Sequence, residues 1–174
     1  RSPQNIRTWD IQPTPDGGYM MVGFFGTMIQ TEPFLAKLTK SGDVLWSRTM
    51  NSYMHTGLFK KALLTADGQV LLLGVDNYTV NHGSADSSIL MKVNSTTGDV
   101  IWARYCRGDI YNITKTDDGG FVFCLNEQYG FPPIYPYLVR LDASGNIIWQ
   151  RKMYHIYSGL PIYRGILYDE SGIY

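Results

Sequence analysis

The sequence carries little charge and no excess of either sign. Fifteen lysine and arginine residues balance fifteen aspartate and glutamate residues, and charged residues make up only 17% of the chain. Electrostatic binding to nucleic acid or to an anionic membrane surface requires a basic excess. We therefore expect no nucleic acid among the partners of this chain.

Long apolar runs are also missing. No stretch approaches the roughly 20 consecutive apolar residues of a membrane-spanning helix, so we expect no membrane insertion within this segment. The chain opens on Arg1, with neither an initiator methionine nor an apolar signal region, which indicates a cut or processed end. What is present is 44% hydrophobic residues, eighteen glycines and thirteen tyrosines, a composition that favours a globular β protein.

One short phrase occurs three times, as PDGGYMMVG, ADGQVLLLG and DDGGFVFCL. Its aspartates, Asp16, Asp67 and Asp118, are spaced by 51 residues, and a further copy starts at Glu170. Each copy continues into an apolar strand with one basic residue and then a Gly-Asp or Gly-Asn turn. Each ends on a tryptophan: Trp46, Trp102 and Trp149. A fixed period of this length is typical of a repeat architecture.

Each unit reads as four short strands. Asp-Gly closes the first hairpin and a Gly-Asp or Gly-Asn turn closes the last, while no segment of useful length has the period of a helix. Four antiparallel strands in about 50 residues predict one blade of an all-β β-propeller. The repeated aspartates are interpreted as turn residues and the repeated tryptophans as packing between blades.

The motif order resembles the β-propeller repeats of secreted and surface proteins of bacteria, archaea and some protists. The motifs are Asp-Gly-Gly-Tyr/Phe, a Leu-Lys-Leu strand, and Gly-Asp-Val-Leu-Trp. The resemblance covers nearly the whole chain and implies an extracellular scaffold or interaction module, secreted or on the cell surface. Its expected partners are other protein chains or copies of itself.

The whole chain, 1–174, is predicted to form one partial propeller. Its blades are expected at about 5–50, 57–106 and 109–153, with the start of a fourth at about 160–174. Propellers contain roughly 4 to 8 blades, so we expect the chain to be a segment of a larger closed propeller. The alternative is a ring closed by self-association of three-blade subunits.

Three sequences fit the N-glycosylation acceptor: those at Asn77, Asn94 and Asn112. Asn94 lies at a predicted hairpin turn, one residue longer than its counterparts, and we expect its tip to project outward. Asn77 begins a variable loop. Asn112 falls inside a first strand near the crowded centre, so a packing role is favoured there. Occupied sites would indicate a eukaryotic secretory pathway.

Other candidate residues are few. Cys106 and Cys124 leave two alternatives open, a disulfide or two reduced buried thiols. Arg107-Gly108-Asp109 matches an adhesion tripeptide, but its place between two blades already explains the glycine and the acidic residue. The loop from Asp76 carries oxygen ligands without the spacing of a calcium site. The three histidines, none beside other ligand residues, are His55, His82 and His155.

No catalytic, cofactor or metal site is therefore predicted. The first strands show no shared ring of polar residues that would line a channel. The sequence favours a non-enzymatic scaffold or protein-interaction propeller, part of a larger surface or filamentous assembly. The alternative is a ligand-binding or catalytic propeller, lectin-like or quinoprotein-like, with its site in the channel or on the loop face.

Overall fold

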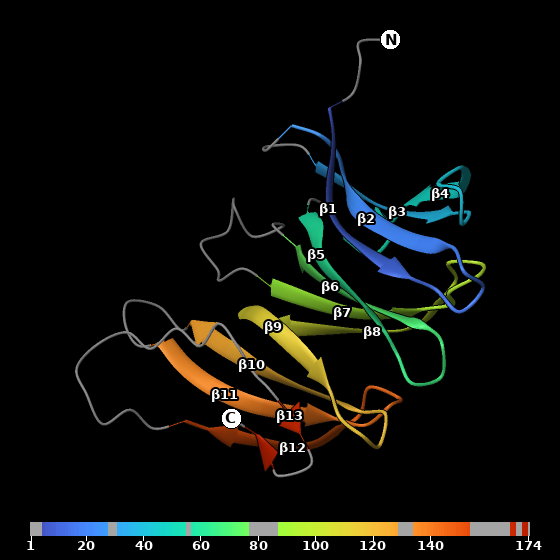
Figure 1. Cartoon of the computed structure of the whole chain (residues 1–174). Helices are drawn as coiled ribbons and strands as arrows, with labels where there is room; N and C mark the ends of the chain where they lie inside the picture. Colours follow the sequence, from blue (N-terminus) through green and yellow to red (C-terminus); the bar gives the residue numbers. More distant parts are fainter. Residues whose placement is uncertain are drawn as a thin grey trace.

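The chain folds into three separate four-stranded antiparallel sheets (Figure 1). The structure is a computed structural model that describes residues 5–27, 31–54, 57–76, 87–128, 134–153, 168–169 and 172–173. No helix occurs in these ranges, and none there could cross a membrane. The predicted all-β class and the four-stranded antiparallel units are confirmed.

Each sheet is a meander in which strands pair in chain order. The first sheet contains β1 (Ile6–Pro13), β2 (Tyr19–Gly26), β3 (Thr31–Leu38) and β4 (Val44–Thr49). The second contains β5 (Gly57–Leu64), β6 (Val70–Asp76), β7 (Ser87–Val93) and β8 (Val100–Arg107). The third contains β9 (Asp109–Lys115), β10 (Phe121–Gln128), β11 (Ile134–Leu141) and β12 (Ile147–Lys152).

Near the C-terminus, β13 (Tyr168–Asp169) pairs with β14 (Gly172–Ile173). This short antiparallel pair lies where the start of a fourth unit is predicted. The remaining residues of that unit lie outside the described ranges.

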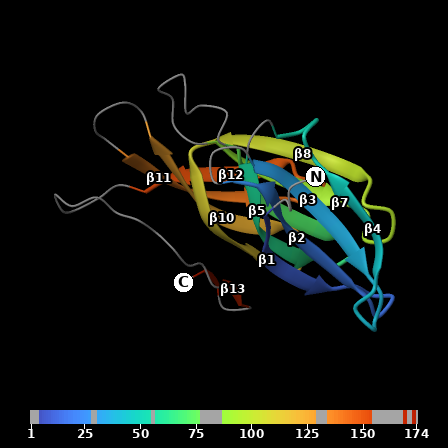
Figure 2. The same ribbon diagram turned by 90° about the horizontal axis from the view of Figure 1, so that it is seen from above.

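The three sheets stack face to face, and a hydrophobic core lies in each of the two interfaces. The first interface joins side chains such as Val22 and Leu35 of the first sheet to Leu72 and Ile89 of the second. The second interface continues on the opposite face of the second sheet, against the third. Figure 2 shows the stack from above, with the first sheet toward the right and the third toward the left.

The repeated Asp-Gly turn is held by the same contacts in every sheet. In the first sheet, Asp16 Oδ1 accepts hydrogen bonds from the Thr14 hydroxyl at 2.7 Å and from the Gly18 amide at 3.1 Å. Gly17 has a φ of 81°, a left-handed conformation that glycine adopts without strain. Lys37 is almost fully buried and donates to Asp16 at 2.7 Å. Its hydrogen bond lowers the pKa of Asp16 to about 2.

The other two sheets repeat this turn, and only the third replaces the lysine with an arginine. Lys92 pairs with Asp67 at 2.8 Å in the second sheet, and Arg140 pairs with Asp118 at 2.6 Å in the third. Burial opposes the shift at Asp67, but hydrogen bonds from Lys92 and Thr65 lower its pKa. The Thr116 hydroxyl lowers the pKa of Asp118 in the same way. Each of the three aspartates therefore connects the third strand of its sheet to the turn between the first two strands.

Candidate functional site at the sheet interfaces

The repeated tryptophans place the two interfaces in equivalent positions. Trp46 in β4 reaches the second sheet, where its Nε1 donates to the Thr96 carbonyl at 2.9 Å. A Cβ built on Gly98 would come within 2.4 Å of its ring. Trp102 in β8 lies in the same way over Gly145 of the third sheet. Only glycine leaves room for an indole at these two turns.

A turn that is one residue shorter changes the second interface. In the first interface, Trp46 donates to the carbonyl of Thr96, which lies in the turn after β7. The corresponding turn after β11 is one residue shorter and has no counterpart of Thr96. Trp102 Nε1 is buried and has no hydrogen-bond partner within the described part of the chain. The third tryptophan, Trp149 in β12, is half-buried beneath the guanidinium of Arg151.

An arginine two residues after Trp46, and another two residues after Trp102, bridge the same sheets as those tryptophans. Arg48 pairs with Asp99 at 2.8 Å, and both side chains are substantially exposed. In the second interface, Arg104 Nε donates to the Gly145 carbonyl at 3.1 Å and a terminal nitrogen donates to Asn146 Oδ1 at 3.2 Å. Arg48 therefore forms an ion pair with the next sheet, whereas Arg104 donates hydrogen bonds to two neutral acceptors.

The link between the first two sheets inserts into their interface, and its residues 50–54 are called the plug below. Met50 and Met54 are buried in the first core, and Tyr53 packs against it. The link is a single turn, in which the amide of Met54 donates to the Met50 carbonyl at 3.1 Å. Tyr105 of β8 donates its hydroxyl to the Tyr53 carbonyl at 2.6 Å. Two methionine side chains thereby fill the space between β4 and the second sheet.

The link between the second and third sheets is shorter and supplies no such plug. The step from Trp102 to Asp118 is five residues shorter than that from Trp46 to Asp67. Gly108 makes the tight connection with a φ of 121°, and its carbonyl accepts from the Ser88 hydroxyl at 2.9 Å. The chain therefore passes directly from β8 into β9.

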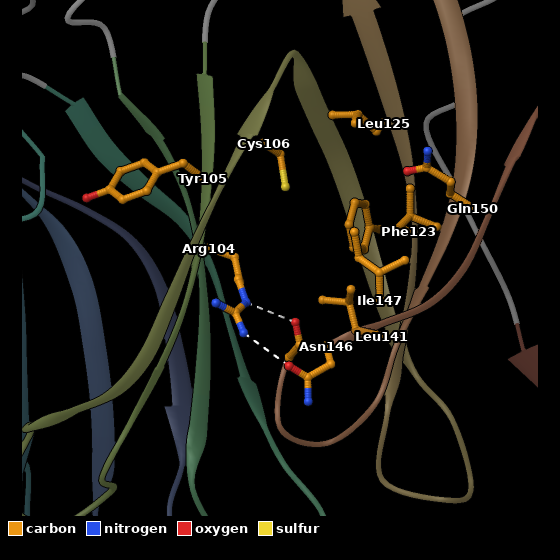
Figure 3. Close-up of a pocket in the computed structure, with 11 residues that line it drawn as sticks. Arg104, Tyr105, Cys106, Phe123, Leu125, Leu141, Asn146, Ile147 and Gln150 are labelled. Atoms are coloured by element: carbon orange, nitrogen blue, oxygen red, sulfur yellow. Dashed lines mark hydrogen bonds between the residues drawn. The ribbon is translucent and has the colours of Figure 1, made fainter.

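A cavity of about 400 Å³ lies at this second interface (Figure 3). Its walls come from β8, β10, β11 and β12, and Figure 3 shows Cys106, Phe123 and Ile147 around it. Arg104 and Asn146 stand at one side, joined by their hydrogen bond. Pockets of this size, with apolar walls and a few polar groups, are typical of ligand sites in proteins. This cavity is the candidate functional site. Its lining residues are Arg104, Tyr105, Cys106, Phe123, Leu125, Val139, Leu141, Gly145, Asn146, Ile147 and Gln150.

Cys106 is the nucleophilic side chain in the cavity wall, and its environment suppresses reactivity. Burial raises the pKa of the Cys106 thiol to about 11, so it is protonated at neutral pH. Cys124 is buried too, and burial raises its pKa. Both cysteines are free thiols, so the disulfide considered from the sequence is not formed in this structure.

The first strands of the three sheets, β1, β5 and β9, called the inner strands below, carry a second set of polar residues that sequence reasoning missed. Asp10 Oδ2 accepts from the Ala62 amide of the second sheet at 2.9 Å. Lys61 donates in turn to Asn112 Oδ1 of the third sheet at 2.5 Å. Asp10, Lys61 and Asn112 each precede the repeated aspartate by six residues, beside the register shift of the inner strand. The spacing of 51 residues between these three polar residues is the sequence signal that could have identified them.

The glycosylation candidates fall in different environments. Asn94 is half-buried at the start of the turn between β7 and β8, where its Oδ1 accepts from the amides of Thr96 and Thr97 at 2.9 Å. The extra residue of this turn brings the Thr96 carbonyl onto Trp46, while Thr96 and Thr97 remain exposed. Asn112 is engaged in β9 by Lys61, and Asn77 lies outside the described residues.

The remaining candidates are not gathered into a site. Arg107, Gly108 and Asp109 form the link into β9, with Gly108 buried. All three histidines lie outside the described residues, as does nearly all of the loop that follows Asp76. Within the described ranges, no cluster of three or more His, Cys, Asp or Glu residues could hold a metal ion.

Comparison with known proteins adds to the fold and not to the activity. No protein-family profile matches the chain, and no curated protein matches it. A solved structure titled "Crystal structure of the eukaryotic initiation factor" is similar in fold, with a TM-score of 0.57 and 8% sequence identity. The match covers 86% of this chain but only 33% of that one. At this identity the likeness concerns the fold alone.

Proposed function

We propose that the chain contributes consecutive blades to a β-propeller that acts as a non-enzymatic protein-interaction scaffold. Three observations support this proposal: the common strand order of the three sheets, the register shift shared by their inner strands, and the tryptophans that join each sheet to the next. Propellers place the first strand of each blade at the centre and the last at the rim. By that order, β4, β8 and β12 form the rim.

The observation that carries the interaction function is the apolar surface of these rim strands. Each strand begins with two aliphatic residues before its tryptophan. Val44 and Leu45 are 62% and 60% exposed, and Ile147 and Ile148 are 62% and 52% exposed. Ile101 of β8 is exposed in the same position as Leu45. The exposed residue directly before the tryptophan recurs in every sheet, whereas Val100, the counterpart of Val44 and Ile147, packs against the first core.

Within the residues that the structure describes, a rim strand also has an unpaired edge, because it is the last strand of its sheet. Edge strands with exposed aliphatic residues pair readily with other chains. Exposed apolar surface of this kind marks protein interaction sites when it is contiguous. We therefore assign other protein chains, or further copies of this chain, as partners of the rim. A surface or filamentous assembly would repeat such contacts.

The compartment proposed is the outside of the cell or its surface. The acceptor sequence at Asn94 supports it, because Thr96 is exposed. In the Asn94 side chain, Oδ1 accepts hydrogen bonds from the turn amides, and Nδ2 is not the atom bound by them. Intact-mass measurement of protein from its own source, before and after enzymatic deglycosylation, tests the assignment. An unmodified Asn94 would contradict it.

Photo-crosslinking tests the interaction function directly. A benzophenone amino acid replaces Leu45, Ile101 or Ile148 in turn, and Lys40, exposed in a polar turn, is the control position. We expect the three rim positions to give a shared, discrete adduct, either with a second copy in pure protein or with one other protein in extract of the source organism. Equal labelling from Lys40, or no adduct from any rim position, would contradict the proposal.

A ligand-binding or catalytic propeller is the second candidate, and the polar residues of the inner strands favour it. Asp10, Lys61 and Asn112 form a row that passes from sheet to sheet. A lectin-like site would use such a row to bind sugar hydroxyls. Binding on a glycan array that Lys61→Met abolishes, with the rim adducts unchanged, would favour this alternative.

A further inference from the structure

The two sheet interfaces are built on one plan, yet one contains a plug and the other contains a cavity. In the first, residues 50–54 of the chain insert two buried methionines. In the second, the corresponding space is the cavity of about 400 Å³ beside Cys106. Among the described residues, the same structural unit therefore occurs once with an occupant and once without one.

Specific substitutions at equivalent positions account for the empty space. Cys106 stands four residues after Trp102, the position that Met50 holds after Trp46. Val139 likewise replaces Met91, the residue before the basic residue of each third strand. In both pairs a long, flexible side chain gives way to a short one. Methionine adapts its shape to irregular gaps, so its loss leaves volume that the neighbours do not recover.

One substitution works in the opposite direction and shapes the cavity. Met54 approaches Gly74 of β6, where its Cε would lie 3.1 Å from an added Cβ. The position of Gly74 in β10 is Leu125, which lines the cavity. Leu125 thus takes part of the space of Met54, whereas the space of Met50 stays open. The volume that remains open is about 400 Å³.

The chemistry of the walls matches that of the plugged interface. Phe123, Leu141 and Ile147 are apolar, like their counterparts Leu72, Val93 and Val100 in the first core. The polar side chains of the lining are Arg104, Asn146 and Gln150, together with Tyr105, whose hydroxyl donates to the Tyr53 carbonyl, and the Cys106 thiol. A ligand that suits these walls is apolar along most of its length and polar where it leaves the cavity. A peptide turn with one methionine has this form.

We propose that the cavity between the second and third sheets binds a methionine-bearing turn of a partner protein. The chain's own residues 50–54 provide the template, because they occupy the equivalent groove as a turn whose first and last residues are methionines. The proposal rests on the proposed interaction function and adds a second, deeper contact to the rim. It requires neither a closed ring nor any residue beyond the described ranges.

A peptide copied from the template provides the probe. The amidated peptide RTMNSYM, residues 48–54, carries a fluorescent label at its N-terminus, and a control peptide has both methionines replaced by serine. Fluorescence anisotropy is measured with the 174-residue chain. We expect saturable binding of the first peptide and at least tenfold weaker binding of the second. Equal binding of both peptides, or none by the first, would overturn the proposal.

Filling the cavity should abolish this binding. The double variant Cys106→Met with Val139→Met restores both side chains of the first interface, and we expect it to bind the peptide at least tenfold more weakly. Lys115→Met, an exposed position in β9, is the matched control and should bind like the native chain. Far-ultraviolet circular dichroism establishes that each variant is folded. Unchanged affinity in a folded double variant would overturn the proposal.

A measurement on the native chain covers the case in which the double variant does not fold. Cys106 lies in the cavity wall, so a bound peptide should slow its alkylation by N-ethylmaleimide several-fold, as followed by peptide mass mapping. Cys124 is the internal reference and should not change. An unaltered rate at Cys106 under saturating peptide would overturn the proposal. Rim adducts that persist in that case would leave the interaction function standing while the pocket fails.

Discussion

The first and second sheet interfaces show how far one repeat can diverge while its framework stays fixed. Both use a tryptophan over a turn glycine and an arginine that reaches the next sheet. The first is sealed by methionines, by an indole hydrogen bond and by an ion pair. The second has a cavity, an indole N–H without a partner among the described residues, and an arginine on neutral acceptors. The first interface should therefore be the more stable, and the second the more adaptable.

Removing the plug should give the largest effect. Met54→Ala creates a cavity in a fully buried site, and Met→Ala changes of this kind cost about 2–5 kcal/mol of unfolding free energy. Cys106→Ala, on the wall of an existing cavity, should cost less than half as much. Urea denaturation of both variants measures the difference. Equal losses would show that the second interface is packed as tightly as the first.

The turn glycines should give the next largest effect. Gly98→Ala places a Cβ 2.4 Å from the Trp46 ring at a φ of +73°, so the indole must move away from the Thr96 carbonyl. Overpacking of this kind costs about 1–3 kcal/mol. At Gly145 the nearest Trp102 atoms would be 3.0 Å away and no indole hydrogen bond would be lost.

Gly145→Ala should therefore cost less than Gly98→Ala, by about the 1 kcal/mol of one hydrogen bond. Thermal denaturation with intrinsic tryptophan fluorescence follows both variants. Gly42→Ala is the matched control, because Gly42 has a similar φ of +92° and nothing within 4 Å of an added Cβ. A loss at Gly98 no larger than that at Gly42 would assign the effect to backbone strain alone.

The framework could be predicted from the sequence, because turn chemistry and strand alternation are local. Asp16, Asp67 and Asp118 sit at turns whose geometry selects aspartate and glycine, and the four strands of each unit follow from them. The sequence predicts no shared ring of polar residues on the first strands, and that interpretation misses the hydrogen bond that Lys61 donates to Asn112 across two sheets. That row becomes visible only when the units are aligned position by position.

The cavity could not be predicted, because the short link between the second and third sheets is hidden in the repeat spacing by a second change in length. A longer stretch within the second unit offsets its shorter link, so the aspartates keep a spacing of 51 residues while the tryptophans do not. The spacing from Trp46 to Trp102 exceeds that from Trp102 to Trp149. This inequality indicates a shortened link but not the volume left behind it. The volume depends on side chains such as Cys106 and Val139, which meet only in the folded chain.

The ion pair of the first interface should give the smallest effect, and pH exposes it. A hydrogen bond from Thr97 and the Arg48 guanidinium lower the pKa of Asp99 in the folded chain. A carboxyl with a lowered pKa stabilises the fold above its unfolded pKa of about 3.9 and loses that contribution as the pH falls below it. Asp99→Asn should therefore lower the urea midpoint slightly at pH 6 and by less at pH 3.

Asp43 provides the control for this comparison, because it holds the position of Asp99 in the first sheet. Its carboxylate accepts from the Ser41 hydroxyl at 2.7 Å, and the ion pairs among the described residues include none to Asp43. Added salt should shrink the effect of Asp99→Asn at pH 6, since exposed pairs are screened, but should leave that of Asp43→Asn nearly unchanged. If Asp99→Asn lowered the midpoint equally at pH 6 and pH 3, the ion pair would contribute nothing to the first interface. The two interfaces would then differ through their methionines and the indole hydrogen bond alone.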